Sequence, residues 1–142
     1  SRQAGFQMYG ATILSSVIYG GALERFPKLR VVLGESGIGW IPYVLMRMDD
    51  QFKERFGQLP LKMKPSEYWR RQCRATFQDD MVGVALLDML GAETVMWASD
   101  YPHGDSIFPD SQEFIERQFG QLPDTVRRKV TCVNAGRFYG LM

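Results

Sequence analysis

The order of elements predicted from this sequence is that of an α/β fold with three parallel strands. Residues 29–33, 73–77 and 94–98 are short and largely apolar, as expected of strands that are buried on both faces of a sheet. Between them, apolar residues recur at steps of three and four, which predicts amphipathic helices. When helices alternate with strands in this way, each helix crosses over the sheet and the strands pair in parallel.

The first half of the chain supplies the first strand and two of the predicted helices. A helix is expected over residues 11–26, and Pro27 ends it because proline cannot continue the helical hydrogen-bond ladder. After the strand, residues 34–39 form a glycine-rich turn. A second helix begins near Trp40, with Pro42 in the first turn, where a backbone N–H has no intrahelical partner.

The second half continues the alternation of helices and strands. Pro65 opens a short helix before the second strand, and Asp80 is placed to cap the next helix, which Gly91 ends. After the third strand, residues 99–110 form a polar loop. Two more helices are predicted beyond this loop, the last of them over residues 123–133.

Size and composition predict one folded domain, residues 1–142, with no nucleic acid or membrane as its partner. Seventeen Lys and Arg nearly balance sixteen Asp and Glu, so no overall field favours a polyanion or a lipid surface. Cys73 and Cys132 form neither a disulfide framework nor a CxxC pair, so we expect buried free thiols and a reducing cytoplasm. Because the sequence begins at Ser1 without a methionine, we expect it to be part of a longer protein.

Ionisable residues follow the first and third predicted strands, where a parallel α/β fold carries its chemistry. Glu35 follows the first strand, and Asp100 and His103 follow the third. Because parallel strands end at one edge of the sheet, we expect these three side chains to share a cavity. Two structural alternatives remain open: Asp100 could cap its own loop, and Glu35 could pair with Arg74.

Each of these residues has a chemistry that suits an active site. Asp100 could ligate a divalent cation or accept a proton from a bound water. His103, the one histidine in the sequence, offers a nitrogen ligand or a general acid and base near neutral pH. Trp40, Tyr101 and Asp105 are candidate substrate contacts, although a tryptophan in this position is also typical of a core.

Three segments of the sequence resemble the second amidohydrolase family. Residues 26–42 read FPKLRVVLGESGIGWIP and are similar to its strand-6 region, where many members have a histidine and this sequence has Glu35. Residues 97–103, WASDYPH, resemble its strand-8 signature, and residues 134–141, NAGRFYGL, resemble its C-terminal helix. The resemblance implies the C-terminal part of a (β/α)8 TIM barrel, with about three βα units.

The same resemblance implies a metal-dependent hydrolase or non-oxidative decarboxylase that acts on a small carboxylated, aromatic or cyclic substrate. By this resemblance, Asp100 would bind the metal or handle the proton of the metal-bound water. Glu35 would be a further carboxylate of the site, and His103 a proton donor or substrate contact. The expected cofactor of the complete enzyme is a divalent metal, zinc or alternatively manganese, and this portion alone need not hold it.

Two other hypotheses follow from what the sequence lacks. A full barrel takes about 250 residues, and a three-stranded sheet has two unpaired edges. The chain could therefore be a non-catalytic partial barrel that forms a homo-oligomer or needs a missing N-terminal half. Alternatively, Glu35 and Asp100 could carry out acid–base chemistry without a metal.

Overall fold

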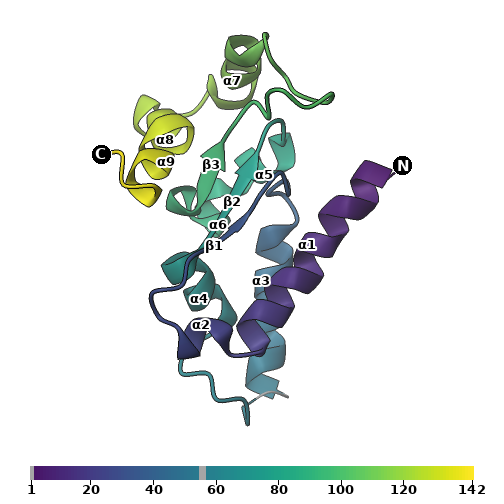
Figure 1. Ribbon diagram of the computed structural model, residues 1–142, viewed down its shortest axis with the longest axis vertical. Helices are drawn as coiled ribbons and strands as arrows, with labels where there is room; N and C mark the ends of the chain where they lie inside the picture. Colours follow the sequence, from purple (N-terminus) through teal and green to yellow (C-terminus); the bar gives the residue numbers. More distant parts are fainter. Residues whose placement is uncertain (1, 55–56) are drawn as a thin grey trace.

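Three parallel strands form the centre of the computed structural model, which describes residues 2–54 and 57–142 (Figure 1). β1 (Val31–Leu33) pairs with β2 (Cys73–Phe77), and β2 pairs with β3 (Val95–Trp97). The predicted parallel α/β arrangement is therefore confirmed, and β2 has the bounds that the sequence predicts.

Both outer strands begin later than predicted because turns occupy the residues before them, and β3 also ends one residue early, at Trp97. The Leu29 N–H donates to the Phe26 carbonyl (2.9 Å), which closes a turn before β1. Thr94 lies in a 3₁₀ turn, and its N–H donates to the Gly91 carbonyl (2.9 Å). Because these N–H groups donate within their turns, they are not available to β2, and the hydrogen bonds to β2 begin only after them.

Helices pack around the sheet. In chain order they are α1 (Arg2–Tyr19), α2 (Ala22–Arg25), α3 (Ile41–Glu54), α4 (Pro65–Gln72), α5 (Met81–Ala85), α6 (Leu87–Leu90), η1 (Ala92–Thr94), α7 (Ser111–Phe119), α8 (Asp124–Arg128), the π-helical turn η2 (Lys129–Val133) and α9 (Asn134–Phe138). Figure 1 shows α1 and α3 side by side, and the Tyr19 hydroxyl of α1 donates to the Met48 carbonyl of α3 (2.8 Å). Within the described ranges, none of the helices combines the length and the apolar character that crossing a membrane requires.

One face of the sheet is buried against the core, and the other is only partly covered. Along β2, Cys73, Ala75 and Phe77 are buried, whereas Arg74 and Thr76 between them are partly exposed. Because side chains alternate across a strand, Arg74 and Thr76 share the face away from the core. The largest fully buried side chains of the core are those of Trp69, Tyr68, Phe77, Phe119, Leu14, Ile18, Leu23, Ile38, Ile41, Leu90, Val95 and Val130.

The helix predicted over residues 11–26 has the wrong bounds, because a glycine turn divides this segment. α1 begins earlier, at Arg2, and ends at Tyr19, and α2 begins at Ala22. Between them, Gly21 has a φ of 72°, in the left-handed region that glycine enters without strain. The chain therefore changes direction before the proline that was expected to end the helix.

The two cysteines differ in environment, although both were expected to be buried. Cys73 begins β2 within the core, and burial raises the pKa of its thiol to about 12. Cys132 is exposed, because the turn of η2 directs Val130 into the core instead. The prediction is confirmed for Cys73, whose thiol stays protonated and unreactive, and it is wrong for Cys132.

Replacing Gly83 with alanine should destabilise the fold, because α5 packs closely against the loop after β1. A Cβ at Gly83 would lie 2.9 Å from the Gly39 backbone nitrogen and closer still to Cγ1 of Ile38. We expect Gly83→Ala to lower the free energy of unfolding, measured by urea denaturation, by about 1–3 kcal/mol. In the control Gly5→Ala, the new Cβ meets nothing within 4 Å, and stability should stay constant or rise by up to about 1 kcal/mol. Equal losses in both variants would contradict the close packing.

Candidate functional site

Glu35 and Asp100 lie beyond the carboxyl ends of β1 and β3 in strained backbone conformations. Glu35 has a φ of 52° and Asp100 a φ of 61°, and within the described residues no other non-glycine residue has a positive φ. A residue with a Cβ is destabilised by about 1–2 kcal/mol in this conformation. Strain of this kind persists where surrounding contacts enforce it, and it is concentrated at functional sites.

Thr76 of β2 fixes the turn that carries Glu35. The Glu35 N–H donates to Oγ1 of Thr76 (2.8 Å), and the Ser36 N–H donates to the Thr76 carbonyl (3.3 Å). The left-handed turn is therefore held by the neighbouring strand. Sequence analysis did not single out Thr76, although a hydroxyl near the end of a largely apolar strand is a signal that could have identified it.

Asp80 holds the rest of the loop after β1. Its Oδ2 accepts the N–H groups of Ile38 (2.6 Å) and Gly39 (2.7 Å), and its Oδ1 accepts the N–H of Gly83 (2.7 Å). Hydrogen bonds to an ionised carboxylate are about twice as strong as neutral ones. The predicted helix-capping role of Asp80 is confirmed, and the same carboxylate also ties the loop after β1 to the start of α5.

His103 lies between the two carboxylates. Its Nδ1 is 2.9 Å from Oδ1 of Asp100 and 3.5 Å from Oε1 of Glu35. The Asp100 side chain is 8% exposed, whereas that of His103 is 61% exposed. The structure thus brings together the three residues that the sequence pattern selected, while their catalytic roles stay predictions.

The loop after β3 is closed by hydrogen bonds to its backbone carbonyls, while the Asp100 carboxylate bonds to His103. The Asp100 carbonyl accepts the His103 N–H (3.0 Å). Farther along, the Ile107 N–H (3.1 Å) and the Ser106 hydroxyl (2.8 Å) both donate to the Ser99 carbonyl. The alternative in which the Asp100 carboxylate caps its own loop therefore does not describe this site.

The alternative ion pair between Glu35 and Arg74 is also wrong. Nη1 of Arg74 donates to the carbonyls of Arg70 (3.2 Å) and Cys73 (2.6 Å), at the start of β2. Glu35 lies at the opposite end of the strands and contacts His103 instead. The length of the sheet separates the two side chains.

The electrostatics of this cluster favour the retention of protons. Asp100 raises the pKa of His103 above its ordinary value, through their hydrogen bond and then through its negative charge, and Glu35 adds to the effect. The pKa of Glu35 is raised as well, first by its hydrogen bond with Asp100, then by burial and by the charge of Asp100. Both groups therefore hold a proton at higher pH than they would in isolation.

Two of the candidate substrate contacts belong to the loop that carries His103. Tyr101 is exposed and packs edge-on against Phe108, with ring centroids 4.8 Å apart. Asp105 is exposed, and its negative charge contributes to the raised pKa of both Glu35 and His103. Both side chains are thus exposed in the loop that carries His103, and substrate contact by either stays a prediction.

Trp40, the third candidate substrate contact, packs against the core. Its indole N–H donates to the Ser36 carbonyl (2.8 Å), and its ring lies against Gly10 of α1. A Cβ at Gly10 would lie 2.8 Å from Cζ2 of Trp40. The ring thus has a structural role, and its contact with a substrate is untested.

Glu35, Asp100 and His103 offer the donors that divalent transition metals take. Two carboxylate oxygens and one imidazole nitrogen suit manganese or zinc. The three ligand atoms lie within 4.8 Å of one another. Ligand atoms at about 2.0–2.2 Å from one ion are at most about 4.4 Å apart. Small side-chain rotations would therefore bring them around one cation, and the residues present fit a divalent metal.

A family model described as amidohydrolase matches residues 4–141 of this chain. Among solved structures, the chain is similar to 5-carboxyvanillate decarboxylase LigW from Sphingomonas paucimobilis, with a TM-score of 0.80 and 33% sequence identity. That match covers 96% of this chain and 41% of the decarboxylase. The chain therefore spans about two fifths of the length of this relative.

Two more distant structures share the fold. A dihydroxybenzoic acid decarboxylase from Polaromonas sp., with bound manganese and 2-nitroresorcinol, has a TM-score of 0.77 at 20% identity, over 96% of this chain and 41% of that one. A 2,6-dihydroxybenzoate decarboxylase from Rhizobium has a TM-score of 0.77 at 19% identity, over 96% and 42%. The predicted fold class, the C-terminal part of a (β/α)8 barrel, is confirmed.

The pKa of His103 should lie above 6.5, its ordinary value, and Asp100→Asn should lower it. The cause is the loss of the negative charge that stabilises the imidazolium. A proton NMR titration can measure this directly, because the sequence has one histidine. Since the folded pKa is raised, the associated stability is present below about pH 6.5 and is lost as the pH rises through the folded pKa.

Asp79→Asn is the matched control for this titration. It neutralises a carboxylate that pairs with Arg117 and is not among the groups that raise the pKa of His103, so it should leave that pKa unchanged. A pKa at or below 6.5 in the unmodified chain, or an equal fall in both variants, would count against the pairing of His103 with Asp100.

Glycine at position 35 should be more stable than alanine, the reverse of the usual order. Both Glu35→Gly and Glu35→Ala remove the carboxylate, but only glycine relieves the strain of a φ of 52°. We expect Glu35→Gly to exceed Glu35→Ala in free energy of unfolding by about 1–2 kcal/mol, measured by urea denaturation. An alanine variant of equal or greater stability would show that the turn is not strained.

Proposed function

Because this chain belongs to the amidohydrolase family, we propose that it supplies part of the metal-dependent active site of a decarboxylase of small carboxylated aromatic compounds. The observation that carries the proposal is the cluster of Glu35, Asp100 and His103 at the carboxyl rim of the sheet. The relative with 33% identity is a decarboxylase of such a compound, as are two more distant ones. These likenesses favour decarboxylation over hydrolysis.

Manganese is the metal that the relatives favour, since the Polaromonas decarboxylase contains it. Zinc, the other metal expected from the resemblance, is the alternative. Asp100, with Glu35 beside it, would hold the cation. Further ligands would come from the part of the barrel that this chain does not span. A divalent cation bound there supplies positive charge that orients a substrate carboxylate and lowers the pKa of a water molecule.

Decarboxylation requires one proton at the ring carbon that loses its carboxylate. When the carbon–carbon bond breaks, carbon dioxide leaves and the electron pair stays on the ring carbon, which then takes up the proton. His103 is suited to hold this proton, because its ring is exposed and an imidazole gains and loses a proton near neutral pH. Asp100 orients the imidazole through Nδ1, so the other ring nitrogen can act on a substrate.

The residues around the cluster support an aromatic substrate. Tyr101 presents an exposed ring in the loop that carries His103, and aromatic rings pack favourably against one another. Asp105 in the same loop could accept a hydrogen bond from a phenolic hydroxyl. We therefore assign substrate contact to Tyr101 and Asp105, and we leave Trp40 a structural role.

A second candidate function is that of a partial barrel that associates with itself or with a segment that completes it. In the described part of the chain, β1 and β3 each pair with one strand, and the face with Arg74 and Thr76 is partly exposed. Unpaired strand edges favour association with other chains. Sedimentation velocity tests this candidate: a monomer that unfolds cooperatively would exclude it, and a concentration-dependent oligomer would support it.

Asp100→Asn should weaken manganese binding by at least about tenfold, because an anionic ligand becomes neutral. Electron paramagnetic resonance of free Mn²⁺ measures the affinity in this chain. In the full-length protein, the variant should also lower kcat for the release of carbon dioxide from 2,6-dihydroxybenzoate by about 100-fold or more.

The control for both measurements is again Asp79→Asn, which removes one carboxylate outside the cluster. It should leave manganese affinity and turnover within about twofold, since Asp79 pairs with Arg117 and is not one of the candidate ligands. Unchanged manganese binding and turnover in Asp100→Asn would refute the proposed role of this aspartate.

A further inference from the structure

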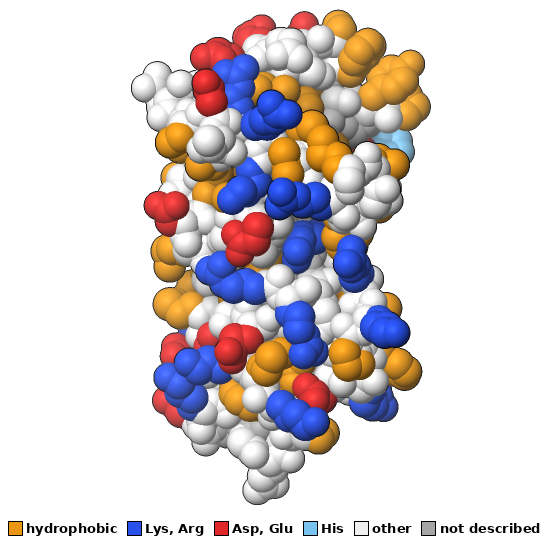
Figure 2. Space-filling model, turned by 90° about the vertical axis from the view of Figure 1, so that its left-hand side faces the viewer, with side chains coloured by type: hydrophobic (Ala, Val, Ile, Leu, Met, Phe, Trp, Pro, Cys, Tyr) orange, Lys and Arg blue, Asp and Glu red, His pale blue; other side chains and the backbone are white. Residues whose placement is uncertain are grey.

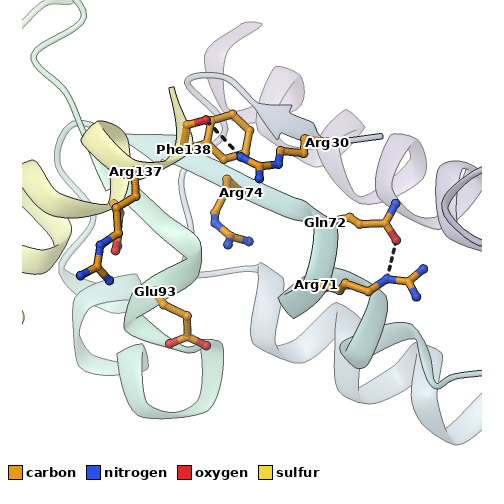
Figure 3. A pocket seen from close by; sticks show the side chains of 8 residues that line it. Arg30, Arg71, Gln72, Arg74, Glu93, Arg137 and Phe138 are labelled. Carbon is orange, nitrogen blue, oxygen red and sulfur yellow. Dashed lines mark hydrogen bonds between the residues drawn. The ribbon is translucent and has the colours of Figure 1, made fainter. Parts of the chain in front are cut away.

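A cavity of about 240 Å³ lies at the rim of the sheet opposite the carboxylate cluster, beside the first residues of β1 and β2 (Figure 3). Arg30 precedes β1, Arg74 lies on β2, and Arg137 and Phe138 come from α9. Its volume equals that of about eight water molecules at roughly 30 Å³ each. The cavity can therefore hold a small ligand, far from the carboxylates at the other rim.

The charge in this cavity is strongly unbalanced. Its lining contains four arginines, including Arg71, and one carboxylate, that of Glu93. Glu93 already pairs with Arg70 (2.9 Å). Within residues 2–54 and 57–142, no carboxylate forms an ion pair with Arg30, Arg74 or Arg137. Figure 2 shows that Lys and Arg side chains also predominate over the middle of the face on the side of the C-terminal helices.

The hydrogen-bond partners of these guanidinium groups are neutral. Arg30 donates to the Phe138 carbonyl (3.2 Å), and Arg74 donates to the Arg70 and Cys73 carbonyls. Each guanidinium has five N–H donors, so most of the donors of Arg30 and Arg74 remain for a ligand. By contrast, Gln72 has no side-chain donor left for a ligand, because both of its amide N–H groups already bond to backbone carbonyls.

The Phe138 ring fixes the position of two of the arginines. The guanidinium carbon of Arg30 lies 5.4 Å from the ring centroid, and that of Arg74 lies 6.0 Å from it. A guanidinium over an aromatic face keeps the N–H groups at its edge free to bond outward. In Figure 3, Arg74 lies between Phe138 and Glu93, and the guanidinium of Arg71 points away from this group.

The positive charges of the two fixed arginines are only partly compensated, since neither forms an ion pair with a described carboxylate. Burial lowers the pKa of Arg74 below its ordinary value, and the nearby Arg30 adds to this effect while Glu93 opposes it. Like charges held together without counterions are destabilising. A bound anion would remove this repulsion, and a planar guanidinium matches the oxygens of a phosphate in a bidentate manner.

We propose that Arg30 and Arg74, held over Phe138, form a binding site for a phosphate group, either free phosphate or the phosphate of a small monoester. This site is independent of the carboxylate cluster and of any decarboxylase activity. Its ligand would bind at the rim where the strands begin. A regulatory ligand or part of a second substrate could therefore bind here while a substrate occupies the carboxylate rim.

Isothermal titration calorimetry of the chain at low salt, with a chelator present, tests this site. The probes are inorganic phosphate and phenyl phosphate. We expect saturable binding that Arg74→Gln and Arg30→Gln each weaken by about tenfold or more, because each removes charged hydrogen bonds to the anion. Tighter binding of phenyl phosphate would identify a monoester as the ligand, and equal affinities would identify free phosphate.

Two further variants make the test specific. Arg47→Gln removes one exposed positive charge of α3 and should leave phosphate affinity within about twofold, since Arg47 does not line the cavity. Asp100→Asn alters the other rim and should leave phosphate binding intact. If Arg74→Gln does not fold, Arg30→Gln and Arg137→Gln, at exposed positions, provide the same comparison. Absence of saturable binding to the unmodified chain, or equal weakening by Arg47→Gln, would overturn the proposal.

Discussion

β2 hydrogen-bonds in parallel to β1 on one side and to β3 on the other, and the positions of all the functional side chains described above follow from this pairing. Parallel strands begin at one rim of a sheet and end at the other. The acids that follow β1 and β3 are therefore neighbours, although 65 positions of sequence separate Glu35 from Asp100. The arginines that precede β1 or begin β2 meet at the other rim for the same reason.

The carboxylate rim is maintained against an unfavourable backbone geometry. Glu35 and Asp100 both have positive φ, a conformation that is unfavourable for a residue with a Cβ. Thr76 holds the first turn from the neighbouring strand, and Asp80 anchors the loop behind it through three backbone N–H groups. A pair of strained acids that converge on one histidine is typical of a site whose geometry serves chemistry.

The two rims carry opposite charge and act separately. A strand of five residues is roughly 16 Å long, and the Debye length is about 8 Å at physiological salt. Charge at one rim is therefore largely screened at the other. Asp100 and His103 control protonation within the first rim, whereas Arg30 and Arg74 repel each other within the second. The chain thus offers an acidic site and a basic site on one small sheet.

The sequence by itself determined the kind of fold and the identity of the acidic residues. Largely apolar runs mark the three strands, although Arg74 lies on the partly exposed face of β2, and position after a strand selected Glu35, Asp100 and His103. Periodicity did not reveal the break at Gly21, since the pattern of apolar side chains continues across that turn. Nor did it reveal that Cys132 faces solvent.

Only the tertiary structure decided which side chains support the site and which form a second one. The bond from Thr76 to the Glu35 turn joins residues 41 positions apart, and no local pattern encodes a contact at such a distance. The approach of α9 to the start of the strands likewise brings Phe138 under Arg30, 108 positions away. Sequence periodicity reports which face of an element is buried, whereas the partners across that face are fixed only when the elements pack together.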